Sequence, residues 1–152
     1  MKNELSRKHR VLIVDDMTQN IKVLSNMLIE EELDVRIAMS GAQALQMTDV
    51  NLPDLILLDI NMPEMDGFET CRRLKTDPIK KDIPIIFLTG YSDTDYKTKA
   101  FSLGGVDYIT KPFKREEVIA RVKTHLEIGT YRKFLEDEVQ KRTLELEIIN
   151  RQ

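Results

Sequence analysis

Cysteine, histidine and long apolar runs are all scarce in this sequence of 152 residues. Cys71 is the only cysteine, which excludes an intramolecular disulfide and a zinc site built from several cysteines. His9 and His125 lie far apart and have no neighbours at metal-ligand spacing, so we expect neither to be catalytic. The longest apolar runs are far shorter than the roughly 18–20 residues that a membrane-spanning helix needs. The first ten residues, MKNELSRKHR, lack the apolar core of a signal peptide, and the sequence therefore predicts a cytoplasmic protein.

Composition and charge indicate an ordinary globular chain. Hydrophobic residues make up 41% and charged residues 32% of the sequence, which is typical of a folded soluble domain. The formal net charge of −3 gives no general affinity for nucleic acid, so we expect no direct nucleic-acid binding by this segment. The length suits one domain with a short appendage.

Five short apolar runs alternate with helical patterns along the chain. The runs that predict strands are residues 11–14, 34–39, 54–59, 83–89 and 106–110. Apolar spacings of three and four predict helices around residues 21–28, 42–46, 68–74, 92–103 and 118–126. Asp77–Pro78 and Gly104–Gly105 are stop signals for the third and fourth helices. The alternation predicts an α/β domain with a parallel sheet, right-handed crossovers and helices on both faces.

Polar residues follow four of the predicted strands: Asp15 and Asp16, then Asp59, Thr89 and Lys111. Because ligands bind beyond the carboxyl ends of strands in open α/β sheets, we expect these side chains to meet at one edge. Three neighbouring carboxylates repel one another, and Mg²⁺ is a natural partner for them. A cation, an ammonium group and a hydroxyl form a receptor for a phosphoryl group, and Asp59 is the best candidate for the carboxylate that carries it.

The loop after Asp59 fits this interpretation. The backbone carbonyl of Asn61 can face the cation, and Pro63 stiffens the turn. Gly67 permits a backbone conformation that other residues resist, and Asp66 is placed to cap the next helix. Each site residue alone has a simpler structural explanation, such as helix capping, but the joint pattern is far more specific.

The motifs VLIVDD, DLILLDINMPEMDG, IPIIFLTG and GGVDYITKPF together resemble the receiver domain of bacterial two-component response regulators, including the chemotaxis regulators. The resemblance implies a flavodoxin-like, doubly wound (βα)5 three-layer sandwich with a five-stranded parallel sheet in the order 2-1-3-4-5. We expect a flexible N-terminus at residues 1–9, the receiver domain at residues 10–127 and an amphipathic helical extension at residues 128–152.

The resemblance also implies the roles of the acidic residues. Asp59 is expected to accept a phosphoryl group from a sensor histidine kinase or phosphotransfer protein, with Mg²⁺ as cofactor. Asp16 is expected to bind Mg²⁺ directly, Asp15 to act largely through water, and the Asn61 carbonyl to complete the protein ligands. Asn61 and Tyr91 resemble positions that tune dephosphorylation in the family.

Other implied roles concern the phosphoryl group and the switch. Lys111 is expected to pair with the phosphoryl oxygens, Thr89 to move towards them and donate, and Gly90 to lie at the same phosphate site. Tyr108 matches the switch aromatic that turns inward when Thr89 moves. The Lys111–Pro112 peptide is commonly cis in receivers.

Two glycines depart from the family pattern. Gly90 and Gly105 stand where receivers usually carry alanine. We interpret both as sources of backbone freedom around the fourth helix and fifth strand, which would loosen the switching surface without preventing phosphorylation.

The last predicted helix continues beyond residue 127. Five apolar residues fit the a and d positions of one heptad frame: Ile128, Leu135, Val139, Leu146 and Ile149. Arg132 and Arg142 occupy other core positions of that frame. The pattern favours a dimeric coiled coil over a solvated helical tail. It is similar to signalling helices that join receivers to cyclic-di-GMP enzymes or histidine-kinase modules, and we expect either a fragment or a regulator that ends in a dimerisation helix.

We expect a switch in which phosphorylation changes the face made by the fourth helix, the fifth strand and the fifth helix. The change would reach a homodimer partner or an output module, which could include a DNA-binding one after Gln152. Two alternatives remain at this point. A phosphatase of the haloacid dehalogenase type needs a second aspartate where Asn61 stands, and a pseudo-receiver usually lacks an acid or the lysine. We therefore expect a phosphoacceptor regulator and not an enzyme.

Overall fold

The residues described in the computed structural model, 7–90 and 94–151, form strands and helices that alternate along the chain. The strands are β1 (Arg10–Val14), β2 (Asp34–Ala38), β3 (Leu55–Asp59), β4 (Ile85–Thr89) and β5 (Asp107–Thr110). The helices are α1 (Thr18–Ile29), α2 (Gly41–Val50), α3 (Gly67–Thr76), α4 (Thr94–Ser102) and α5 (Arg115–Asn150). The sheet is parallel throughout, with the order β2-β1-β3-β4-β5.

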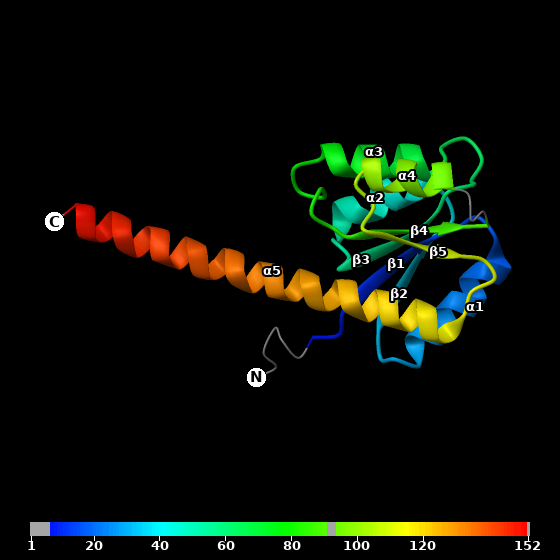
Figure 1. Ribbon diagram of the computed structural model, residues 1–152, viewed down its shortest axis with the longest axis horizontal. Coiled ribbons are helices and arrows are strands. Elements are labelled where there is room, and N and C mark those ends of the chain that lie inside the picture. Colours follow the sequence, from blue (N-terminus) through cyan, green and yellow to red (C-terminus); the bar gives the residue numbers. More distant parts are fainter. Residues whose placement is uncertain (1–6, 91–93, 152) are drawn as a thin grey trace.

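Helices cover both faces of the sheet, which makes the predicted doubly wound, three-layer, flavodoxin-like sandwich. Helices α2, α3 and α4 lie on one face, and α1 and the first part of α5 lie on the other (Figure 1). Strands β3 and β4 are buried at every residue because both of their faces contact helices. On β3, Ile56 and Leu58 join the core under α3, while Leu55 and Leu57 join the core under α1 and α5.

Some predicted boundaries shift. The fourth strand begins at Ile85 and not at residue 83, since Pro84 has no N–H group to give to a sheet ladder. The expected helix start at Ser92, the Tyr91 position and residues 1–6 of the expected flexible N-terminus lie outside the described residues. Gly104 has φ of 101°, the left-handed conformation that ends α4 as predicted.

Gly105 has a different role from the predicted one. A β-carbon at this position would lie within 3 Å of the Phe87 ring and 3.0 Å from the carbonyl oxygen of Ala100. Only Gly104 among the described glycines has a positive φ. The interpretation of Gly105 as a source of backbone freedom is therefore wrong: the buried Phe87 leaves no room for a side chain there.

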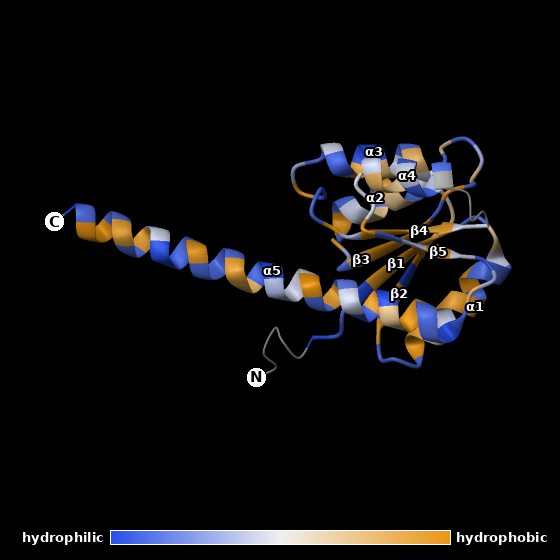
Figure 2. Cartoon of the chain, viewed as in Figure 1, coloured by the Kyte–Doolittle hydropathy of each residue, from blue (hydrophilic) through white to orange (hydrophobic). Residues whose placement is uncertain are grey.

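Helix α5 is 36 residues long and buries only its first part. Val118, Val122 and Leu126 face the sheet, and beyond them the helix extends away from the domain (Figure 1). Apolar residues continue along the projecting part (Figure 2). Among the described residues, no helix has both the length and the apolar character needed to cross a membrane.

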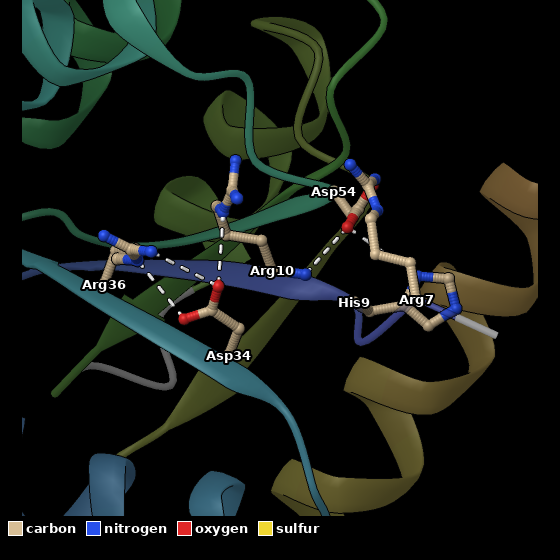
Figure 3. A network of polar contacts seen from close by, with 6 residues as sticks. All are labelled: Arg7, His9, Arg10, Asp34, Arg36 and Asp54. Atoms are coloured by element: carbon tan, nitrogen blue, oxygen red, sulfur yellow. Dashed lines mark hydrogen bonds and ion pairs between the residues drawn. The ribbon is translucent and has the colours of Figure 1, made fainter. Parts of the chain in front are cut away.

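A polar network at the amino ends of the strands holds α5 where it leaves the domain. Asp54 accepts hydrogen bonds from the Arg10 backbone N–H at 2.7 Å and from the Arg7 guanidinium at 3.3 Å (Figure 3). The same carboxylate lies 3.8 Å from Lys133 Nζ of α5. Arg132, the preceding residue, donates to the Asp82 carbonyl at 2.6 Å. These contacts join α5 to its own domain at the point where the helix leaves it.

The second acid of this network joins the edge strand β2 to its neighbour β1. Asp34 of β2 accepts from Arg10 of β1 at 3.4 Å and from Arg36 at 3.2 Å (Figure 3). The two guanidinium groups lower the pKa of Asp34, with Arg36 as the larger cause.

Candidate functional site

Three carboxylates converge at the carboxyl ends of β1 and β3. Asp15 and Asp16 follow the last residue of β1, and Asp59 is the last residue of β3. The two strands pair in parallel, with Val14 opposite Leu58, so their ends are adjacent. One oxygen from each of Asp15, Asp16 and Asp59 lies within 4.8 Å of the others. The sequence-predicted cluster therefore forms in the folded chain.

Asp15 is fully buried and held by the start of α1. Its Oδ1 accepts the Met17 backbone N–H at 2.9 Å, and its Oδ2 accepts the Asn20 side-chain amide at 3.2 Å. Burial raises the pKa of Asp15 despite these bonds. Sequence analysis missed Asn20, and the only signal for it was its place in the first turn of α1, five residues after Asp15.

Asp16 differs from Asp15 in having a buried oxygen with no donor. Its Oδ1 is shielded from solvent and has no hydrogen-bond partner among the described residues. A buried, unpartnered carboxylate oxygen is costly, and a bound cation would remove that cost. Hard oxygen donors at this separation suit Mg²⁺, which often takes one or two carboxylates and completes its shell with water and phosphate. The residues present therefore fit a Mg²⁺ ion.

Asp59 is 2% exposed, and its environment opposes ionisation. Burial first, and then the charge of Asp15, raise its pKa from 3.8 to about 6. Lys111 Nζ donates to Asp59 Oδ1 at 3.1 Å and partly offsets this shift. The Lys111 backbone N–H also bonds the Thr89 carbonyl at 2.8 Å, and the Lys111–Pro112 peptide is cis. The lysine is thus fixed at the strand ends.

The end of β4 completes this edge of the sheet. Thr89 is the last residue of β4 and is 1% exposed. Asp59 lies opposite Leu88 in the sheet, so Thr89 is one residue beyond the level of Asp59 on the neighbouring strand. Gly90 follows, and a β-carbon there would meet nothing within 4 Å. There is therefore open space beside Gly90, whereas the Thr89 side chain is buried.

The loop after Asp59 is shaped by close packing. A β-carbon on Gly67 would overlap the Asp59 carbonyl oxygen and lie 2.8 Å from the Ile60 Cα. Gly67 has no positive φ, so the predicted reason for this glycine is wrong: it is needed for space, not for conformation. Asp66 caps α3 as predicted and accepts the Glu69 backbone N–H at 2.8 Å. Pro63 accepts the Met65 N–H at 2.8 Å, within the turn that carries the exposed Asn61.

Tyr108 of β5 lies among groups from α4 and α5. Lys97 Nζ is 4.5 Å from the centre of its ring, and the Phe101 ring meets it edge-on at 5.9 Å. The Arg121 guanidinium is 5.7 Å from the same ring and pairs with Asp107. A cation close to the ring face stabilises the tyrosine side chain in this position. Tyr108 is therefore in contact with both helices of the predicted switching surface.

Comparison with known proteins gives one consistent family. The family model described as "Response regulator receiver domain" matches residues 11–123. Response regulator PleD of Caulobacter vibrioides is 40% identical over 115 residues, covering 76% of this chain and 25% of PleD. A Vibrio cholerae protein named "Probable cyclic di-GMP phosphodiesterase" is 39% identical over 144 residues, covering 90% of this chain and 32% of that protein. The chain thus spans between a quarter and a third of these two relatives.

Solved structures agree with the fold. The chemotaxis protein CheY4 of Vibrio cholerae has a TM-score of 0.74 at 28% identity, over 78% of this chain and 98% of that one. The signal receiver domain of a signal transduction histidine kinase from Syntrophus aciditrophicus has a TM-score of 0.73 at 35% identity, over 78% and 90% of the two chains. With the geometry of its strand ends, these matches show that the chain belongs to the response regulator receiver domain family.

Proposed function

We propose that the chain is a phosphorylation-dependent switch and that Asp59 is its phosphoacceptor. The observation that carries the proposal is the buried Asp59 carboxylate, held between Lys111 on one side and the acids Asp15 and Asp16 on the other. No other described carboxylate combines burial, a lysine partner and two acidic neighbours within 4.8 Å. A carboxylate in this position is placed to act as a nucleophile towards phosphorus.

In the proposed reaction, an Asp59 carboxylate oxygen attacks the phosphorus of a phosphohistidine on the donor. The new O–P bond forms as the N–P bond breaks, and the electron pair of that bond returns to the donor imidazole. In this proposal the Lys111 ammonium neutralises charge on the phosphoryl oxygens, and the Thr89 hydroxyl and the Gly90 backbone N–H donate to them. We propose that donors of this kind are sensor histidine kinases or phosphotransfer proteins, and a cytoplasmic location agrees with such donors.

Mg²⁺ is the proposed cofactor. Asp16 would hold it through the oxygen that has no other partner, with Asp59, the Asn61 carbonyl and the water-bridged Asp15 as further ligands. When bound, the cation would neutralise the carboxylates and the incoming phosphoryl group. Asp15 is already held by Met17 and Asn20, which supports a positioning role for it.

The proposed output passes from Thr89 through Tyr108 to the α4-β5-α5 face. A phosphoryl group on Asp59 adds charge and acceptor oxygens beside Thr89. A shift of Thr89 would let Tyr108 leave Lys97 and Arg121, which changes the contact of α4 with α5. Because α5 continues out of the domain, a partner or output module attached to it would receive this change.

The relatives support an output module joined through α5. A match over 90% of this chain necessarily extends beyond residue 123 and into the projecting helix. The relative matched that far is named for an action on cyclic di-GMP, and we propose an output of that class. The chain itself would carry out only phosphoryl uptake and loss, since Asn61 provides no second acid for a phosphatase.

Phosphorylation of the purified chain by acetyl phosphate with Mg²⁺ tests the proposal. We expect one acid-stable, hydroxylamine-sensitive phosphoryl group per chain, and none in Asp59→Asn. Asp137→Asn, an exposed aspartate on α5, is the matched control and should be phosphorylated normally. Equal uptake by Asp59→Asn would move the acceptor elsewhere, and uptake that is unchanged in EDTA would remove Mg²⁺ from the reaction.

A further inference from the structure

Helix α5 has two apolar faces on different sides, in different parts of its length. Val118, Val122 and Leu126 are buried against the sheet. The projecting part carries a second stripe, the outer seam, with side chains that are 46–65% exposed: Ile128, Tyr131, Leu135, Val139, Leu146 and Ile149. At about 100° per residue, the outer seam occupies an arc of about 80° centred roughly 140° from the buried face. The outer seam therefore points away from its own domain.

We propose that the outer seam packs against the outer seam of a second copy of this chain, as a parallel coiled coil. With Arg142 included, successive positions of the seam are three or four residues apart, which is the spacing of knobs in a coiled coil. A projecting helix of this length is marginal alone in water, so a packed partner is needed to stabilise it.

The charges of the projecting helix favour a copy of itself over a strongly charged partner. Residues 131–151 contain five basic and five acidic side chains, so two such helices carry no net repulsion. A seam with coiled-coil spacing is complementary to the same seam on another copy. The neutrality of the helix argues against an acidic or basic partner surface, and the spacing of the seam argues for self-pairing.

The structure also selects the frame of the seam. A strict heptad frame would place Arg132 in the seam between Ile128 and Leu135, whereas the outer seam has Tyr131 there. Arg132 instead donates to the Asp82 carbonyl of its own domain at 2.6 Å, and its neighbour Lys133 lies 3.8 Å from Asp54. Both cations are thus directed to the domain, which leaves Tyr131, 65% exposed, to fill the seam. The proposed seam therefore differs from the expected heptad frame at this one position.

Arg142 favours the parallel direction. In a parallel pair, Arg142 lies opposite its own copy, and only one layer of the seam is polar. In an antiparallel pair centred on the seam, each Arg142 would lie against Leu135 of the other copy and disturb two layers. Burying a charge against an apolar side chain is costly in every layer where it occurs. The two like charges of the single parallel layer repel each other, but the arginine stems are long enough for the guanidinium groups to turn out to solvent, so one polar layer disturbs the seam less than two.

Disulfide cross-linking of the full chain tests this inference. Cys71 is buried and its pKa is raised to about 11 by burial, so the native thiol stays protonated and does not interfere. Single variants Leu146→Cys and Tyr131→Cys should form covalent dimers on mild oxidation, several-fold more than their matched off-seam partners Leu144→Cys and Arg132→Cys. Leu144 is exposed and apolar like Leu146, which makes it a close control.

Three results would overturn the inference. Equal cross-linking of Leu144→Cys and Leu146→Cys would mean that the outer seam is not the contact. Preferential cross-linking of Tyr131→Cys with Leu146→Cys, when the two are mixed, would show an antiparallel pair. A monomeric mass at all concentrations in light scattering would exclude self-pairing. The inference goes beyond the phosphoryl chemistry, since Asp59→Asn should keep the same cross-linking pattern, and either proposal can fail without the other.

Discussion

Lys111 Nζ donates to Asp59 Oδ1 at 3.1 Å across the end of β4. Asp59 is the last residue of β3, Lys111 follows β5, and β4 lies between these two strands in the sheet. Among the described residues, Lys111 is the only cation in contact with this carboxylate, and the charge of Asp15 acts against it. Burial is the largest influence on the protonation of Asp59, and the balance between one ammonium and two acids modifies it. This balance also decides how easily a phosphoryl group can be accommodated there.

Replacing Lys111 should shift this balance. In Lys111→Met, the pKa of Asp59 should rise above about 6, because the hydrogen bond and charge that lower it are lost while burial and Asp15 remain. Carbon NMR titration of the Asp59 carboxyl measures the shift, and acetyl phosphate labelling should fall at least about tenfold. Lys114→Met, an exposed lysine, is the control. An unchanged Asp59 titration would contradict the role given to Lys111.

The stability of the metal-free chain should depend on pH through Asp59. Its pKa is about 6 in the folded chain and 3.8 ordinarily, so the unfolded chain loses its proton first as pH rises. Stability should therefore fall between about pH 4 and pH 6 and level off above, by about 3 kcal/mol for this group.

The asparagine of Asp59→Asn does not titrate. The unfolding free energy of this variant relative to the native chain should therefore increase across the same pH range. Urea unfolding in EDTA at pH 4.5 and pH 7.5 measures the change, and Mg²⁺ at pH 7.5 should stabilise only the native chain. A difference between the two chains that is independent of pH would show that Asp59 titrates normally.

Gly67→Ala should damage both stability and phosphorylation. The added β-carbon overlaps the Asp59 carbonyl oxygen, and backbone cannot move away as a flexible side chain can. We expect a loss of about 1–3 kcal/mol in unfolding free energy and reduced labelling of Asp59. Gly129→Ala, where a β-carbon meets nothing within 4 Å inside α5, should gain about 0.5–1 kcal/mol and label normally. Native-like stability of Gly67→Ala would refute the close approach.

The sheet and the site edge could be predicted because both depend on patterns along the chain. Continuous apolar runs predict strands that are buried on both faces, and the polar residue after each run marks the edge where the acids meet. The assignment of Asp16, and not Asp15, as the direct metal ligand came from the family resemblance. The orphan oxygen of Asp16 now supports that assignment by geometry.

What the sequence could not predict depends on distant neighbours. The need for glycine at 67 and 105 follows from the backbone of Asp59 and the ring of Phe87, which only the folded chain brings close. The contact of Asp54 with Lys133 joins residues far apart in the sequence. Choosing Tyr131 over Arg132 for the seam required knowing that Arg132 bonds the domain.

The Asp54 network should hold the exit of α5. Asp54→Ala removes the acceptor of the Arg10 N–H and the partner of Lys133, and should cost about 1–3 kcal/mol. Asp54→Asn keeps an acceptor oxygen but loses the charge, and should cost less. Hydrogen exchange in residues 128–136 should become faster in the alanine variant. Exchange in β4 should change only as much as the global free energy of unfolding changes. Unchanged protection in residues 128–136 would mean that the network does not hold the helix.

Arg142→Leu should strengthen self-association of the chain. The substitution replaces the one charged layer of the outer seam by an apolar one, which removes the repulsion between two like charges and lets apolar side chains pack there. We expect the dimer dissociation constant to fall by at least about tenfold, equivalent to about 1.4 kcal/mol. Sedimentation equilibrium of the full chain measures this constant.

Lys141→Leu is the control. It adds the same apolar side chain one residue earlier, outside the seam, and should leave the dissociation constant within about threefold, since its side chain stays in solvent. If Lys141→Leu strengthened association as much as Arg142→Leu, the effect would be non-specific hydrophobic association of the helix. If Arg142→Leu weakened it, the arginine would be making a favourable contact with a carboxylate of the partner copy, and the seam would have to be redrawn around that pair.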